Sequence, residues 1–375
     1  MNYNKKRRRL FKNKDSKGYL YSTKKSRLDI FEKKLSVLIL IIFVCIIIYV
    51  AVIATVKNVT SQDDLEDRYI SLTTAETGTK DVYGAQKDAS GNVTSINDVV
   101  PISCYGDSFT NAADDATVSY PGVLSVYAQR TVYNLAVDSD TIFEMAAREG
   151  GVSAVVSPFI IPVSKTPTEV VLTNEDGKAL NFDFSKNGGF NPCTIQGVEG
   201  LLSIIDGKYS FTRADSGDET LVLTPTEVET RAMSLRTDDI CVFFLGDDDI
   251  YNTPEEAIEI YNRMIEYLDD NSSYLIVGPV KGEVAELDAA NAALAEAFGD
   301  KFLDLRRYLI TQADEDINIT LSEDDSILAD NNIIPYIYFA DNDSLSAQGA
   351  DAVGKAVYDK LNSLGYFADA QSDAE

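Results

Sequence analysis

The sequence predicts an α/β fold, in which a doubly wound parallel sheet carries a small inserted antiparallel β domain and follows one transmembrane helix. Apolar runs of strand length alternate with helical patterns on both sides of residues 152–236, as in parallel sheets covered by helices. Short β-branched runs separated by turns fill that middle segment. An uncharged run at 35–56 lies ahead of the first predicted strand.

The uncharged run, LSVLILIIFVCIIIYVAVIATV, would span roughly 33 Å as a helix, about the thickness of a bilayer core. Residues 1–34 before it carry 13 Lys and Arg but only three Asp and Glu, and basic flanks stay on the cytoplasmic side of a membrane. We therefore expect a basic cytoplasmic tail at 1–34, a single-pass signal-anchor in the cell membrane at 35–56, and an extracellular C-terminal part.

The composition excludes several classes of function. The chain's net charge is −27, and the part after the basic tail carries 20 Lys and Arg against 57 Asp and Glu, a net charge of −37 that would repel nucleic acid. The chain has no histidine, which excludes His-dependent triads and His-ligated zinc sites. One of the four cysteines, Cys45, lies in the predicted span. Cys104 and Cys241 lie in apolar runs, so we expect buried thiols rather than a disulfide framework.

The part after the predicted span divides by its sequence texture. Residues 57–98 are polar and aperiodic, as expected of a stalk, and 369–375 are expected to form a disordered tail. Between them, residues 99–151 and 237–368 together predict the α/β domain, and 152–236 predict the inserted β domain.

The elements of these domains follow from hydrophobic period and from helix-start signals such as Thr253-Pro254. The α/β domain is predicted to contain strands at 99–105, 131–137, 239–245, 274–277 and 302–305, and helices at 120–130, 141–148, 254–268, 283–298 and 346–364. The insertion is predicted to contain strands at 152–156, 169–173, 180–184, 201–205, 209–212 and 220–223.

Polar residues gather where the predicted strands end. Gly106-Asp107-Ser108 turns away from the first strand and places a serine hydroxyl at the edge where open α/β sheets bind ligands. A polar turn without chemistry is the alternative, because Gly-Asp-Ser is a common tripeptide. The other candidates follow the second and third strands or precede the last helix: Asp138, Ser139, Asp140, Asp247, Asp248, Asp249, Asp341, Asp343 and Ser344.

The order of four segments resembles the SGNH (GDSL-type) hydrolases, including membrane-anchored bacterial members with a β insertion. Residues 105–110 (YGDSFT) are similar to the nucleophile segment, and 134–141 (NLAVDSDT) to the segment with the oxyanion glycine. Residues 245–249 (LGDDD) are similar to the Gly-x-Asn-Asp segment, and 341–349 (DNDSLSAQG) to the Asp-x-x-His segment. The resemblance covers 99–366 without the insertion. It implies a flavodoxin-like three-layer α/β/α fold and cleavage of acyl esters of lipids and glycans.

The resemblance assigns the nucleophile to Ser108 and its acid partner to Asp341. Ser344 stands at the position of the family's histidine, Asp248 at that of the oxyanion Asn, and Ser139 at that of the oxyanion Gly. Serine at the glycine position keeps the backbone donor. Loss of the Asn side-chain donor costs about 10²–10³ in rate, and the Asp248 carboxylate adds repulsion.

We therefore predict a degenerate member, a pseudo-enzyme on the bacterial cell surface that binds a cell-envelope glycan or protein. The alternative is an active serine esterase or acyltransferase that acts on acyl esters of envelope glycans through Ser108. This alternative needs a base other than histidine, and Asp343 could serve only if burial raised its pKa.

No cofactor is expected, with one alternative. Converging carboxylates would suit a hard cation such as Ca²⁺, and the candidate ligands are Asp138, Asp247, Asp248 and Asp343. Acidic residues also cap helix N-termini or face solvent, so the cluster alone does not decide between these roles. Three arginine positions are expected to form structural ion pairs, with a ligand clamp as the alternative: Arg148, Arg213 and Arg306-Arg307.

Overall fold

The structure is a computed structural model. It describes residues 99–111, 119–138, 140–184, 186–247, 251–269, 273–341 and 344–367, together with short strands at 82–83, 86–87 and 93–94. All of the described residues belong to one compact unit within residues 65–375.

The larger part of this unit is built around a six-stranded sheet in the order β1-β5-β4-β15-β16-β17. Its two central strands, β4 (Ile102–Gly106) and β15 (Ile240–Phe244), are buried along their whole length. The other three parallel strands are β5 (Val132–Asn134), β16 (Tyr274–Val277) and β17 (Phe302–Leu303). β1 (Val82–Tyr83) pairs with β5 in the antiparallel direction.

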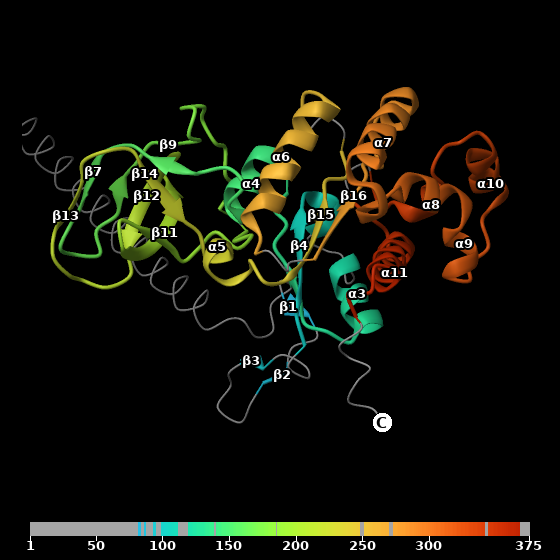
Figure 1. The fold of residues 1–375 in the computed structure, drawn as a ribbon, viewed down its shortest axis with the longest axis horizontal. Coiled ribbons are helices and arrows are strands. Elements are labelled where there is room, and N and C mark those ends of the chain that lie inside the picture. Colours follow the sequence, from blue (N-terminus) through green and yellow to red (C-terminus); the bar gives the residue numbers. More distant parts are fainter. Residues whose placement is uncertain are drawn as a thin grey trace, which may run out of the picture. The chain divides into compact units, whose positions relative to one another are not determined.

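Helices cover both faces of this sheet (Figure 1). Alternate residues of a strand point to opposite faces, and β15 shows this clearly: Cys241 and Phe243 pack on one side, and Val242 and Phe244 on the other. The first face is covered by α4 (Ile142–Glu149), α6 (Pro254–Tyr267) and α7 (Val284–Phe298), and the second by α3 (Tyr120–Ala128), α8 (Leu305–Thr311) and α11 (Ala347–Ser363).

Residues 155–229 form a curled antiparallel sheet of seven strands in the order β8-β12-β11-β10-β14-β6-β9. Its side chains, among them Leu202 and Phe211, belong to the same hydrophobic cluster as Met145 of α4. α5 (Arg231–Leu235) leads from it to β15. The strands are β6 (Val155–Val156), β8 (Thr168–Glu169), β9 (Leu172–Thr173), β10 (Cys193–Ile195), β11 (Val198–Ile205), β12 (Lys208–Arg213) and β14 (Thr226–Glu229). A separate ribbon pairs β7 (Phe159–Ile161) with β13 (Thr220–Val222).

The predicted fold class is wrong. Instead of a flavodoxin-like three-layer fold with a purely parallel sheet, the structure is a mixed α/β fold with two sheets. β1, from the predicted stalk, adds an antiparallel edge strand to the parallel one. The insertion forms a curled seven-stranded antiparallel sheet, and its apolar side chains share a core with α4 and α6.

The predicted transmembrane helix is not found in the part of the chain that the structure describes, where no helix is long and apolar enough to cross a membrane. The span expected at 35–56 lies outside the described residues, as do the basic tail at 1–34 and the tail at 369–375. The predicted stalk contains β1 and, after it in the sequence, two strands that pair in the antiparallel direction: β2 (Gln86–Lys87) and β3 (Val93–Thr94).

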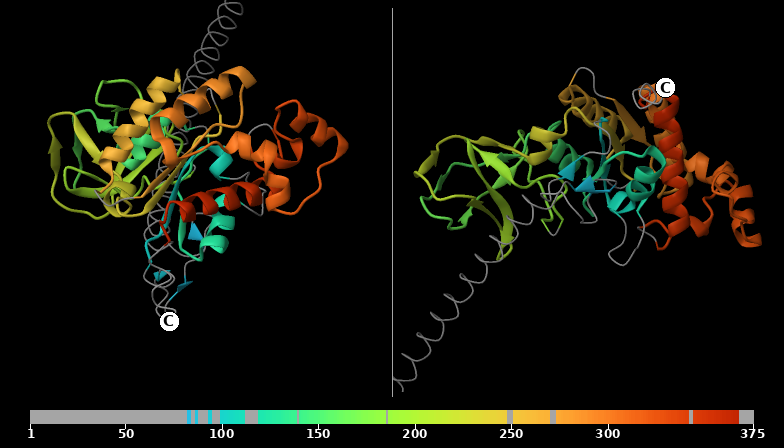
Figure 2. Two further views of the ribbon diagram at one scale, coloured as in Figure 1. Left: turned by 45° about the vertical axis from the view of Figure 1, so that its right-hand side comes forward. Right: turned by 90° about the horizontal axis from the view of Figure 1, so that it is seen from below.

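Most individual elements of the α/β part lie where the sequence predicts them. α6 begins after Thr253, whose hydroxyl accepts a hydrogen bond from the backbone N–H of Glu256 at 3.2 Å. α11 lies beside α3 (Figure 2), where Gly354 allows close approach, since a Cβ there would lie 2.6 Å from Val123. As expected, Cys104 and Cys241 are buried free thiols.

Several elements differ from the prediction. In the insertion, β7, β10 and β14 were not predicted. Residues 180–184 form no strand, although Leu180, Phe182 and Phe184 are buried, because the aromatic rings pack against Phe190 instead of extending a ladder. Residues 299–341, with few predicted elements, also contain η3 (Gly299–Lys301), α9 (Ala313–Asp316), α10 (Glu323–Asp330) and η4 (Tyr336–Tyr338).

Candidate functional site

Ser108 is the first residue of α2 (Ser108–Asn111), the short helix that follows β4. Gly106 makes the turn possible, since a Cβ at that position would lie 2.1 Å from the carbonyl oxygen of Phe244. Ser108 is half-buried, and its hydroxyl makes no hydrogen bond with another described residue. No described residue therefore accepts a hydrogen bond from Ser108 Oγ.

The carboxylate of the neighbouring Asp107 is buried and faces the backbone. Its Oδ1 accepts a hydrogen bond from Phe109 N at 3.0 Å, and its Oδ2 accepts from Gly246 N at 2.8 Å and Asp247 N at 3.4 Å. Burial raises the pKa of Asp107 to about 7, although these backbone donors favour the ionised form. Both carboxylate oxygens accept backbone hydrogen bonds, so Asp107 stabilises the turn and is not oriented as a base for Ser108.

Asp341 and Ser344, the proposed acid and the residue at the histidine position, contact each other. Ser344 Oγ donates a hydrogen bond to Asp341 Oδ1 at 2.7 Å, and Ser344 is buried. Ser346, the N-cap of α11, donates to the carbonyl of Ile337 at 2.6 Å and so fixes the loop from the other side. The Asp341 carboxylate is therefore partly occupied by its own loop.

The first and last candidate segments lie side by side. The ring of Phe109, next to Ser108, packs edge-on against Phe339 with centroids 6.3 Å apart. Phe339 is two residues before Asp341. The structure therefore brings the residue after Ser108 and the segment before Asp341 into contact.

A further contact joins the ends of β15 and β16. Lys281 Nζ lies 2.7 Å from Oδ2 of Asp247, and both side chains are partly exposed. The sequence reasoning did not single out Lys281, although it follows the carboxyl end of a predicted strand, the same rule that identified Asp247.

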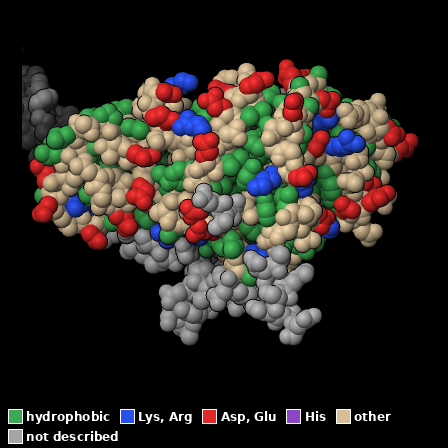
Figure 3. All heavy atoms as spheres, viewed as in Figure 1, with side chains coloured by type: hydrophobic (Ala, Val, Ile, Leu, Met, Phe, Trp, Pro, Cys, Tyr) green, Lys and Arg blue, Asp and Glu red, His purple; other side chains and the backbone are tan. Residues whose placement is uncertain are grey.

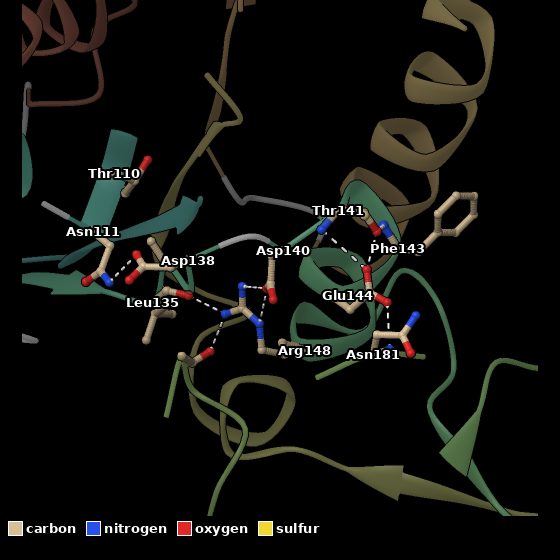
Figure 4. Close-up of polar contacts among 12 residues, drawn as sticks. Thr110, Asn111, Leu135, Asp138, Asp140, Thr141, Phe143, Glu144, Arg148 and Asn181 are labelled. Carbon is tan, nitrogen blue, oxygen red and sulfur yellow. Dashed lines mark hydrogen bonds and ion pairs between the residues drawn. The ribbon is translucent and has the colours of Figure 1, made fainter. Parts of the chain in front are cut away.

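A buried arginine, Arg148, holds residues 134–141, the segment that resembles the one with the oxyanion glycine (Figure 4). Arg148 Nε donates to Asp140 Oδ2 at 2.9 Å, and the guanidinium also donates to the carbonyls of Leu135 and Gly188. Burial raises the pKa of Asp140 to about 6, and Arg148 opposes this shift. Gly188 lies in the insertion and Leu135 follows β5, so Arg148 is structural and ties the two parts together.

The remaining arginines also make structural contacts. Arg213 donates to the carbonyl of Pro162 at 2.8 Å and to that of Asp215 at 2.6 Å. Arg306 forms an ion pair with Asp288 at 2.6 Å. The expected ion pairs are thus found for Arg148 and Arg306, whereas Arg213 is held by hydrogen bonds to backbone carbonyls.

The calcium alternative finds no support in the described residues. Asp138 accepts a hydrogen bond from Asn111 at 2.7 Å, Asp140 pairs with Arg148, and Asp247 pairs with Lys281. Over the ranges that the structure describes, no group of three or more Asp, Glu, Cys or His side chains could hold a metal ion. Two of the candidate calcium ligands, Asp248 and Asp343, lie outside these ranges, as do the site candidates Ser139 and Asp249.

A cavity of about 670 Å³ lies between residues 280–287 and residues 333–341, and we call it the Lys281–Asp341 cavity. Both residues in its name line it, and so does Phe339, whereas Ser108 does not. Figure 3 shows acidic side chains spread over the viewed face, with hydrophobic side chains gathered near its middle. The sequence reasoning missed this cavity, because two segments about 50 residues apart form it.

Comparison of the chain with protein-family models, with curated proteins and with solved structures found no match. The geometry of the described residues therefore carries the functional conclusion.

Proposed function

We propose that this chain is a degenerate relative of the SGNH hydrolases that binds a cell-envelope glycan and does not hydrolyse esters through Ser108. The observation that carries the proposal is the hydrogen bond from Ser344 to Asp341 Oδ1. An acid partner orients a catalytic histidine by accepting its N–H. Here the chain has no histidine, and a serine hydroxyl takes one carboxylate oxygen.

The size and the lining of the Lys281–Asp341 cavity support binding of a small ligand. The Lys281–Asp341 cavity falls within the size range of small-molecule sites, about 300–1,000 Å³. Its wall includes the polar groups of Lys281 and Asp341 and the ring of Tyr336, which is 70% exposed. An aromatic ring beside hydrogen-bonding groups suits a sugar, which presents both C–H faces and hydroxyls. The membrane anchor, the extracellular location and an envelope protein as ligand stay predictions from the sequence.

Two measurements on the purified full-length protein test this proposal. The wild type and Ser108→Ala should turn over p-nitrophenyl acetate at the same background rate, since no described residue accepts a hydrogen bond from Ser108 and the chain has no histidine. The wild type should co-sediment with insoluble cell-wall glycan, and Asp341→Ala should weaken this at least several-fold. Asp176→Ala, an exposed aspartate in a turn of the insertion, is the matched control and should bind as the wild type does.

The alternative esterase makes the opposite prediction. Ester turnover well above background that Ser108→Ala abolishes would establish an active enzyme and overturn the proposal. Absence of co-sedimentation with any wall fraction would reject glycan binding, and capture of a single envelope protein instead would favour the other ligand class.

A further inference from the structure

The Lys281–Asp341 cavity has a charge that differs from the rest of the domain. Its lining contains two basic side chains, Lys281 and Arg306, and one acidic side chain, Asp341. The carboxylates that pair with the two cations, on Asp247 and Asp288, are not among the lining residues. The lining therefore carries more positive than negative charge, although the part of the chain after the basic tail is strongly acidic.

The guanidinium of Arg306 is buried and fixed in position. Arg306 lies on α8, and its side chain is only 6% exposed. Its Nη1 donates a hydrogen bond to Asp288 Oδ1 of α7 at 2.6 Å, and its Nη2 donates to the carbonyl of Asn332, which follows α10. Because three segments hold this side chain in place, little of its conformational entropy is left to lose when a ligand binds.

Arg306 also keeps hydrogen-bonding capacity for a ligand. A guanidinium has five N–H donors, and the hydrogen bonds of Arg306 with described residues use two of them. The buried guanidinium of Arg148, which is not part of this lining, makes four such bonds. The Asp288 side chain is 54% exposed, so water screens its attraction to Arg306. The remaining donors favour a negatively charged acceptor, and carboxylate and phosphate oxygens match the planar fork of a guanidinium.

We propose that the Lys281–Asp341 cavity binds the anionic substituent of a sugar, a carboxylate or a phosphate, through Arg306 and Lys281. This inference rests on the proposed function and narrows its ligand to an acidic glycan. An ammonium has three N–H donors, so Lys281 can contact the anion without leaving Asp247. The sugar ring would lie towards Tyr336 and Asp341, whose aromatic ring and carboxylate suit its C–H face and hydroxyls. The apolar part of the lining reduces the access of water and so strengthens the attraction.

Three sugars that differ only at carbon 6 test this proposal: glucose, glucuronate and glucose 6-phosphate. Their dissociation constants are measured by ligand-observed NMR titration of the purified full-length protein at one ionic strength. At least one of the two anionic sugars should bind at least tenfold more tightly than glucose, as expected for a hydrogen bond to a charged group. Tighter binding of glucuronate identifies a uronate as the source of the anion, and tighter binding of glucose 6-phosphate identifies a phosphorylated sugar.

Variants of the two cations test their roles separately. Arg306→Met should weaken binding of the preferred anionic sugar at least tenfold and leave binding of glucose unchanged, which a merely structural role would not produce. Arg306→Lys should retain part of the preference, because it keeps the charge but loses the planar fork. Lys281→Met is a second variant that should fold, since the Lys281 side chain is 37% exposed, and it should reduce the preference at least threefold.

Arg307→Met is the matched control. Arg307 is the neighbouring arginine on the same helix, but it is exposed and lies outside the cavity lining. This variant should bind all three sugars as the wild type does. Thermal melts of the four variants check that each is folded.

The proposal is overturned if glucose binds as tightly as both anionic sugars, or if neither anionic sugar binds. It is also overturned if folded Arg306→Met and Lys281→Met keep the wild-type preference. Retention on wall glycan separates the two proposals. If wall glycan retains the protein but the anionic sugars are not preferred, the anion site fails and the glycan-binding function stands. If the preference is present and depends on Arg306 but wall glycan does not retain the protein, the reverse holds.

Discussion

Gly246 donates its backbone N–H to Oδ2 of Asp107 at 2.8 Å, across 139 positions of the chain. The bond joins the turn after β4 to the end of β15, the central pair of strands in the six-stranded sheet. The turn that holds Ser108 is therefore fixed by an interaction that needs no catalytic partner. The shape of the turn therefore does not depend on a histidine near Ser108.

Replacing Asp107 by Ala should destabilise the protein by about 3 kcal/mol. Three backbone N–H groups, on Phe109, Gly246 and Asp247, would lose their acceptor inside the protein, and each unsatisfied donor costs about 1–3 kcal/mol, not additively. Urea unfolding measures the change. Asp215→Ala is the control, because that side chain is 96% exposed and should change stability by less than about 0.5 kcal/mol. Equal losses would contradict the role of Asp107.

Stability should fall as the pH rises from about 4 to about 7. Burial raises the pKa of Asp107 to about 7 and those of Asp140 and Asp239 to about 6, from the ordinary aspartate value of 3.8. The folded state therefore binds these protons more tightly than the unfolded state. The resulting contribution to stability is fully present below about pH 4 and is lost as the pH rises through the raised pKa values.

The urea midpoint measured at a series of pH values tests this dependence. Asp107→Asn should flatten the change between pH 4 and 7 relative to the wild type, because its side chain does not titrate. The same variant isolates Asp107 from the general repulsion among acidic residues, which also grows with pH. An unchanged slope would show that Asp107 does not titrate in this range.

Replacing Arg148 by Met should cost about 3–5 kcal/mol, as expected when a buried ion pair loses one partner. The change leaves the Asp140 carboxylate buried and removes a donor from the carbonyls of Leu135 and Gly188. The double variant Arg148→Met, Asp140→Asn should be more stable than Arg148→Met alone, because no charge is left unpaired. Arg307→Met, at an exposed arginine, serves as the control, and thermal unfolding reports all four proteins.

Gly106→Ala should destabilise the protein far more than Gly177→Ala. A Cβ at Gly106 would lie 2.1 Å from the Phe244 carbonyl and 2.3 Å from the Thr110 hydroxyl, so the central strands would have to separate. Gly177 has no atom within 4 Å of such a Cβ and a φ of +79°, so its substitution costs only about 1–2 kcal/mol of backbone strain. Comparable unfolding midpoints for the two variants would refute this account of the turn.

The sequence predicts the central strands well because they are continuous apolar runs. β15 and β16 match the predicted ranges 239–245 and 274–277 to within one residue at each end, whereas β4 begins three residues after and ends one residue after the predicted range 99–105. Strands buried on both faces are mainly apolar, which makes them easy to recognise. α10 (Glu323–Asp330) was not predicted, because it is short and acidic and has one buried residue, Asp325. Such a helix has no apolar period to detect.

The candidate site divides in a similar way. Residues at strand ends, such as Ser108 and Asp247, can be found by position along the chain, because parallel strands end at one edge of a sheet. The contacts they make cannot, since Lys281 and Ser344 reach their partners through loop geometry that no period encodes. The cavity wall at 333–341 was missed for the same reason. Its irregular backbone places Ile333 and Phe339 beside α7 without a repeating pattern.

The guanidinium of Arg148 has a consequence for anyone who wishes to trim or exchange parts of this protein. The guanidinium donates to the Gly188 carbonyl, and Thr230 Oγ1 donates to the Arg148 backbone carbonyl at 2.6 Å, so both partners lie within residues 152–236. Residues 152–236 thus cannot be removed without breaking contacts of Arg148. A chain with that stretch cut out, or replaced by one from another protein, would carry an interior cation that has lost one of its carbonyl acceptors.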